Sequence, residues 1–199
     1  MNRKEVEEIL CRDPILAGLI KQVGPYRLEA APDRYRALVE AVVSQQLSGR
    51  VADRIIEKIH GIYGRSPTPD QILATPDSAL RKVGLSRMKI AYIREISEKT
   101  EDGTLPLQQM AGMSDEEVIR VLTRIRGIGV WTAQMFLIFS LGRHDVLPTG
   151  DLGIRRRFAE LYGITQEDEM IRQAERWRPY RTVASWYLWK SAKVAGGAV

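Results

Sequence analysis

The sequence has a single cysteine, Cys11, among its 199 residues. One cysteine excludes an intrachain disulfide framework, a Cys-x-x-Cys zinc or redox motif and a four-cysteine iron–sulfur cluster, and it is typical of a reducing compartment. The chain also lacks an apolar run near the ~20 residues that span a bilayer, and residues 1–10 are too charged for a secretory signal. These absences predict a cytoplasmic protein without a membrane segment.

Acidic residues are scarce in the C-terminal part of the chain. Residues 1–119 carry 17 basic and 18 acidic side chains, whereas residues 120–199 carry 13 and 7. Clustered positive charge favours a polyanionic partner, because each neutralised phosphate releases condensed counterions. The alternative is a solvated surface that keeps the protein soluble, and charge alone does not decide between the two.

Strand signals are almost absent, and nearly every segment has the capping residues and 3.6-residue apolar spacing of a helix. Asp13-Pro14 is an N-cap followed by proline, and Thr68-Pro69 and Thr75-Pro76 repeat this device. Longer helices are expected over residues 15–23, 34–47, 49–63, 87–99, 114–122, 130–141, 152–162 and 182–194. The pattern predicts an all-α protein without an internal repeat or long linker.

The most informative motif is a pair of glycines, Gly127 and Gly129, between two helical patterns. Glycine allows backbone torsions and close approaches that a Cβ would prevent, and a helix that begins directly afterwards points several N–H groups at one place. We therefore expect Gly127, Gly129 and Thr132 to bind a phosphate. The alternative is a plain glycine-terminated helix followed by another, because Gly-x-Gly alone is a weak signal.

Asp151 follows Gly129 by 22 residues, at the end of the sequence Pro148-Thr149-Gly150-Asp151. The proline and the glycine predict a turn, so we expect Asp151 at or just before the start of the next helix. Aspartate is a favoured N-cap. That structural role explains the residue adequately in most proteins, and it is compatible with a second, chemical role.

A set of five motifs spans the chain: Asp13-Pro14 with Leu19-Ile20, residues 41–48, residues 127–133, Pro148 to Asp151 and residues 177–189. In order and spacing, this set resembles the 3-methyladenine (alkylpurine) DNA glycosylases of the helix-hairpin-helix superfamily. The resemblance implies one glycosylase domain over residues 1–199, in which two helical lobes flank a cleft. Lobe one would cover about residues 34–142, and lobe two about residues 1–33 plus 143–199. Some relatives carry an N-terminal β domain, which we expect to be absent because so few residues precede Arg34.

The resemblance implies a monofunctional DNA glycosylase that flips out alkylated purines of the 3-methyladenine and 7-methylguanine type and hydrolyses their N-glycosidic bond, the first step of base excision repair. Asp151 would be the catalytic carboxylate, and the partner of the monomeric protein would be double-stranded DNA with damaged bases. The family hairpin also implies a Na⁺ or K⁺ ion on the backbone carbonyls of Thr123, Ile125 and Ile128. No cofactor is expected for catalysis, and the cysteine count excludes the iron–sulfur branch of the superfamily.

Base flipping requires a side chain that fills the vacated gap in the DNA. The resemblance places such an intercalating side chain in residues 44–48, where Gln46 is the candidate and Leu47 lies beside it. The alternative is that Leu47 belongs to the core and that Gln45 and Gln46 are polar residues at a helix end.

Aromatic residues make up only 7% of the chain, yet three of the four tryptophans lie between residues 177 and 189. Trp186 and Trp189 are three positions apart and therefore neighbours on one helix face. Because aromatic rings stack on bases and attract cationic ones, we expect Trp189, then Trp186 and more weakly Tyr26 to line a base pocket. An ordinary core would use the same residues.

Trp131 occupies the position, two residues after Gly129, at which lyase members of the superfamily carry a lysine, so we expect no lyase activity. Arg178 and Arg181 either meet phosphates, stabilise the carboxylate or lie at the surface. Two further hypotheses stay open: a non-catalytic helix-hairpin-helix DNA-binding protein in which Asp151 only caps a helix, and a glycosylase for deaminated or oxidised bases.

Overall fold

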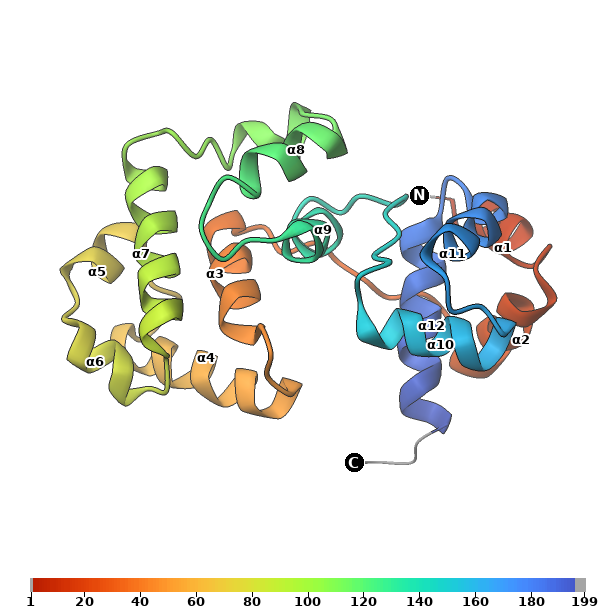
Figure 1. Cartoon of the computed structure of the whole chain (residues 1–199), viewed down its shortest axis with the longest axis horizontal. Helices are drawn as coiled ribbons and strands as arrows, with labels where there is room; N and C mark the ends of the chain where they lie inside the picture. The colour runs from red at the N-terminus through yellow and green to blue at the C-terminus, as the bar shows by residue number, and fades with distance from the viewer. Residues whose placement is uncertain (1, 196–199) are drawn as a thin grey trace. The chain divides into compact units, whose positions relative to one another are not determined.

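The computed structural model describes the backbone of residues 2–195 and the side chains of residues 2–192. These residues form helices and connecting turns and contain no strand, which confirms the all-α prediction. The chain folds as two compact units (Figure 1): a terminal unit, made of the residues up to Glu29 and those from Gly142 onward, and a central unit, Ala30–Leu141. In the part described, no helix is both long and apolar enough to cross a membrane.

The central unit contains α3 (Arg34–Ser44), α4 (Gly49–Tyr63), α5 (Pro69–Ala74), α6 (Asp77–Lys82), α7 (Arg87–Glu101), the 3₁₀ helix η1 (Gln109–Gly112), α8 (Asp115–Leu122) and α9 (Val130–Phe139). Helix α3 packs against α4, α7 and α9, and α8 packs against α9. Leu38 and Val42, one turn apart on α3, are buried with Ile93 of α7 and Leu137 of α9. Burying each such side chain contributes about 1.5–3 kcal/mol. This core holds the ends of α8 and α9, between which the two glycines lie.

The terminal unit contains α1 (Arg3–Leu10), α2 (Pro14–Val23), α10 (Leu152–Tyr162), α11 (Glu167–Ala174), the 3₁₀ helix η2 (Glu175–Trp177) and α12 (Arg181–Ala195). Helix α12 packs against both α2 and α10. Its residues Val183, Ala184 and Leu188 are completely buried. Segments from the two ends of the sequence therefore share one hydrophobic core.

A buried carboxylate, Asp13, joins these distant segments. It caps α2, and its Oδ1 accepts a hydrogen bond from the backbone N–H of Ile15 at 3.0 Å. Its Oδ2 accepts hydrogen bonds from Tyr162 Oη at 3.2 Å, Gln173 Nε2 at 3.1 Å and Trp177 Nε1 at 3.0 Å. A buried charge is tolerated only with such donors, so the predicted cap of α2 also anchors the C-terminal helices.

Capping residues predicted the exact boundaries of some helices and the wrong boundaries of others. Helices α4 and α10 begin and end where predicted. The helix predicted over residues 34–47 ends at Ser44, because Gln46 has a φ of +56°, which a right-handed helix cannot accommodate. At α6 the N-cap is Pro76 rather than the predicted Thr75.

Two α-helices of the terminal unit were not predicted. Helix α1 consists largely of charged residues, but Val6 and Leu10, one turn apart, are buried against the unit. Helix α11 is similar, with Met170 and Ala174 as its buried pair. Two apolar positions in eight residues give too weak a periodicity to separate a short docked helix from a loop.

Candidate active site and DNA interface

The turn between α8 and α9 contains the two predicted glycines. Gly127 has a φ of +79°, the left-handed conformation that favours glycine, and a Cβ there would lie 2.1 Å from Cδ2 of Tyr92. Gly129 is the N-cap of α9, and the first hydrogen bond of this helix runs from Ala133 N–H to Gly129 O at 3.1 Å. The N–H groups of the first turn precede this bond and therefore have no acceptor within the helix. Such N–H groups are suited to binding an anion.

Gln45, at the end of α3, holds this turn in place. Its Nε2 donates hydrogen bonds to the carbonyl of Gly127 at 2.8 Å and to the hydroxyl of Thr132 at 3.0 Å. The Thr132 side chain is buried and its hydroxyl serves this internal contact, so the phosphate contact predicted for Thr132 would have to come from its backbone amide. Gln45 is the C-cap of α3, so it is a polar residue at a helix end, but its contacts with the turn were not predicted, because partners 82 and 87 residues away leave no local pattern.

Gln46 is the only non-glycine residue with a positive φ, +56°, in the part of the chain described. This conformation costs such a residue about 1–2 kcal/mol, so its surroundings must maintain it. Lys89 of α7 does so by donating from Nζ to the carbonyls of Val43 at 2.6 Å and Gln45 at 2.8 Å, and burial lowers the pKa of Lys89. Gln46 is exposed and Leu47 is 37% exposed, so Leu47 is not a core residue.

Asp151 is the N-cap of α10, as the sequence predicted. Its Oδ1 accepts two hydrogen bonds at 2.9 Å, one from the backbone N–H of Ile154 and one from the indole N–H of Trp189 on α12. Asp151 and Trp189 are both half-buried. The carboxylate is therefore held by N–H donors from two helices rather than by its own helix alone.

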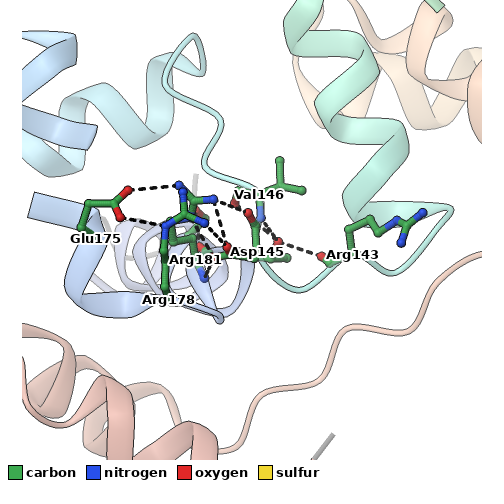
Figure 2. Close-up of polar contacts among 8 residues, drawn as sticks. Arg143, Asp145, Val146, Glu175, Arg178 and Arg181 are labelled. Carbon is green, nitrogen blue, oxygen red and sulfur yellow. Dashed lines mark hydrogen bonds and ion pairs between the residues drawn. The ribbon is translucent and has the colours of Figure 1, made fainter. Parts of the chain in front are cut away.

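The loop that precedes Asp151 is tied to the start of α12 by a network of ionic contacts (Figure 2). Arg181 donates from Nε to Asp145 Oδ1 at 2.7 Å, and from Nη2 to Asp145 Oδ2 at 3.0 Å and to its carbonyl at 2.9 Å. Arg178 donates to Asp145 Oδ2 and to Glu175 Oε2, each at 2.8 Å. Both arginines thus have carboxylate partners within their own unit.

Thr182 extends this network to the backbone of the loop. Its Oγ1 donates to the carbonyl of Arg143 at 2.8 Å and accepts from the N–H of Val146 at 2.9 Å, while its own N–H donates to the carbonyl of His144 at 2.9 Å. Figure 2 shows the Arg143 side chain pointing away from the cluster, so this residue takes part through its carbonyl. The loop leading to Asp151 is thereby fixed to α12.

The aromatic residues predicted for a base pocket lie in different environments. Trp186 is 8% exposed and packs edge-on against Tyr26 and Tyr187, with ring centroids 5.1 and 5.0 Å apart. Burial raises the pKa of the Tyr26 phenol from its ordinary value near 10 to about 12. Trp177 is fully buried. Of the three tryptophans in the cluster, Trp189 is the one that contacts Asp151.

The remaining predicted positions lie in and beside the turn between α8 and α9. Thr123 is the C-cap of α8, and the buried side chains of Ile125 and Ile128 anchor the turn to the core. The Ile125 carbonyl accepts the N–H of Ile128 at 3.1 Å, which uses one of its two lone pairs. Neutral carbonyl oxygens are a type of ligand that suits a monovalent cation such as Na⁺ or K⁺. Trp131, in the first turn of α9, is half-buried.

The central unit contains a glycine turn between two helices, and an aspartate that caps a later helix follows it in the chain. Residues 39–181 match the family described as HhH-GPD superfamily base excision DNA repair protein. The chain belongs to this family.

Relatives in this family have closely similar sequences and structures. The chain is 39% identical over 186 residues to DNA-3-methyladenine glycosylase 1 of Schizosaccharomyces pombe, covering 89% of this chain and 82% of the relative. A solved structure of the 3-methyladenine DNA glycosylase of that yeast, in complex with abasic DNA, has a TM-score of 0.89 at 36% identity and covers 98% of this chain and 100% of its own. The DNA-3-methyladenine glycosidase of Bacillus halodurans has a TM-score of 0.82 at 39% identity, covering 96% and 90%.

Proposed function

We propose that this chain is a monofunctional DNA glycosylase that flips alkylated purines out of double-stranded DNA and hydrolyses their N-glycosidic bond. The observation that carries the proposal is the half-buried carboxylate of Asp151, held at the start of α10 by the N–H groups of Ile154 and Trp189. Relatives named as 3-methyladenine glycosylases support the substrate class, purines of the 3-methyladenine and 7-methylguanine type. The product is an abasic site, which starts base excision repair.

The chemistry follows from the charge that develops when the bond breaks. As the base leaves, positive charge builds on the deoxyribose in an oxocarbenium-like transition state. The Asp151 carboxylate stabilises that charge, and it orients or deprotonates the water that attacks the sugar. This stabilisation is largest at the transition state, so it accelerates the reaction rather than tightening the binding of the substrate.

A cationic methylated purine is already a good leaving group and needs no acid to protonate it. Stacking on an aromatic ring stabilises a base by about 1–3 kcal/mol, and a cationic base gains an additional cation–π attraction. Trp189, which is half-buried, is the first candidate for this contact. Trp186 and Tyr26, which pack edge-on against each other, are the further candidates to line the proposed pocket.

Binding to DNA uses the central unit. The first-turn amides of α9, with Gly127 and Gly129, contact one backbone phosphate, and the carbonyls of Thr123, Ile125 and Ile128 hold a Na⁺ or K⁺ ion that stabilises the turn. The exposed Gln46, with Leu47 beside it, fills the gap left by the flipped nucleotide. Catalysis needs no further cofactor, and the protein acts as a monomer.

The test is base release from a set of duplexes that each contain one lesion. We expect 7-methylguanine and 3-methyladenine to be released faster than neutral 8-oxoguanine or uracil under single-turnover conditions, with abasic sites revealed by alkaline cleavage. Asp151→Asn, purified in parallel, controls for contaminating enzymes. Faster release of a neutral oxidised or deaminated base would assign a different substrate. Binding to lesion duplex without release of any base would make the chain a non-catalytic DNA-binding protein.

A further inference from the structure

The contact between Trp189 and Asp151 joins two helices at the candidate catalytic atom. The Ile154 N–H, which donates to Asp151 Oδ1, belongs to the helix that Asp151 caps, whereas the Trp189 indole comes from α12. A carboxylate with one capping donor turns easily about its Cβ–Cγ bond and exchanges its two oxygens. A second donor from an independent element disfavours this rotation and fixes the plane of the carboxylate.

Gly153 provides the space for this arrangement. An ideal Cβ at this position would lie 3.0 Å from Asp151 Oδ1, 3.4 Å from Trp189 Cδ1 and 3.6 Å from Trp189 Nε1. Its φ is not in the left-handed region, so backbone conformation does not require glycine here. The requirement is steric, because a Cβ at residue 153 would be tight against Asp151 Oδ1 while making ordinary van der Waals contact with the Trp189 indole.

We infer that Trp189 is a positioning residue for the proposed reaction: its indole N–H holds the Asp151 carboxylate in the orientation that stabilises positive charge on the deoxyribose. The inference rests on the proposed function and deepens it. It gives Trp189 a role that is independent of the damaged base and separate from stacking. Gly153 supports this role by leaving room for the Asp151 carboxylate oxygen that accepts the indole N–H.

The physical reason is preorganisation. A charged group stabilises a transition state best when it is already oriented before the reaction begins, because no energy is then spent on reorientation. A hydrogen bond from a neutral N–H to a carboxylate is strong enough to select one orientation. Replacing the indole by a phenyl ring removes this donor but keeps an aromatic face.

Binding of two abasic duplexes separates positioning from stacking, because neither contains a base. One duplex carries neutral tetrahydrofuran in place of the deoxyribose, and the other carries a cationic pyrrolidine that mimics the charged sugar. The ratio of their Kd values reports how well the carboxylate stabilises the charge. We expect the parent to prefer the pyrrolidine duplex by about tenfold or more, and Asp151→Asn to lose this preference.

For Trp189→Phe we expect the preference to fall by at least about threefold, with affinity for the neutral duplex within about twofold of the parent. Gly153→Ala should lower the preference in the same direction. In the double variant Trp189→Phe with Asp151→Asn, the first change should add nothing to the second, since it acts through the carboxylate.

Trp177→Phe is the matched control, because it also removes an indole N–H that donates to an aspartate, Asp13, in the same unit. It should lower the melting temperature and leave the preference unchanged. An unchanged preference in Trp189→Phe, with a parent that discriminates and releases bases, would overturn the inference alone. A parent that neither prefers the cation nor releases any base would contradict the proposed function itself.

Discussion

Arg181 and Asp145 form a paired contact in which Nε and Nη2 of the guanidinium meet Oδ1 and Oδ2 of the carboxylate at 2.7 and 3.0 Å. The two residues are 36 positions apart in the sequence. Arg181 begins α12, and Asp145 lies in the loop that leads to Asp151 (Figure 2). The pair therefore connects the helix that carries Trp189 to the backbone that carries the candidate catalytic carboxylate.

This geometry predicts that Arg181→Lys is destabilising. Lysine keeps the charge but cannot form the planar two-point contact, and the Arg181 side chain is only 15% exposed. We expect the free energy of unfolding to fall by about 1–2 kcal/mol, measured by urea denaturation. Arg178→Lys is the matched control: Arg178 is 48% exposed, so a change below about 0.5 kcal/mol is expected. Equal losses of unfolding free energy in the two variants would show that the two-point contact of Arg181 with Asp145 adds no stability beyond that of an exposed ion pair.

Asp151→Asn tests whether this residue is catalytic or only a cap. Asparagine retains an oxygen that can cap α10, so the melting temperature and the affinity for lesion DNA should stay close to those of the parent. Excision should fall at least about a hundredfold under single-turnover conditions, in line with the loss of one preorganised electrostatic group. Asp151→Ala should lose activity as well and, in addition, about 0.5–2 kcal/mol of stability. Near-parental excision by the asparagine variant would leave Asp151 as a helix cap.

Gln46→Ala should weaken binding to a duplex with an abasic analogue and slow excision of paired lesions more than excision from single strands. Unstacking a base costs a few kcal/mol, which the inserted side chain partly offsets, and a single strand has little stacking to replace. Rate constants for the two substrate forms, compared under single-turnover conditions, give the result. Equal slowing on both would remove Gln46 from this role.

Two neighbouring substitutions separate insertion from backbone effects at this turn. Gln46→Gly removes the strain of the φ of +56°, so this variant should be at least as stable as Gln46→Ala. Its rate of excision from duplex should be no higher than that of Gln46→Ala. Gln45→Ala removes the contacts to Gly127 and Thr132. It should therefore slow excision from duplex and single strand alike, because it loosens the turn that we propose to bind phosphate and leaves the Gln46 side chain in place.

The protein should have no lyase activity, because Trp131 stands at the position where the lyase members of the superfamily carry the lysine that forms a Schiff base. Borohydride added during turnover on a methylated duplex should trap no covalent protein–DNA adduct above background. A strong adduct would mean that another lysine reaches the sugar. Lys190, which is exposed and lies 5.4 Å from the centroid of the Trp186 ring, is the first to replace with methionine in that case.

Local chemistry determined several helix ends. Gly49–Tyr63 and Leu152–Tyr162 were predicted to the residue, since caps, glycine stops and apolar spacing act over a single turn of chain. The N-cap position of Asp151 follows from the same short-range rules. The early end of α3 at Ser44 was missed because it depends on Lys89, whose contacts with Val43 and Gln45 lie 46 and 44 residues away.

The sequence by itself therefore determined the all-α class, the glycine turn and the capping role of Asp151. Only the tertiary structure decided which donor meets which acceptor: Gln45 with Gly127, Arg181 with Asp145, and the Trp189 indole with Asp151. The sequence around a tryptophan does not indicate whether its indole N–H contacts solvent, a base or a carboxylate. The packing of α12 against α10 brings this indole to Asp151, and helix packing depends on apolar contacts spread over the whole unit rather than on residues near either side chain.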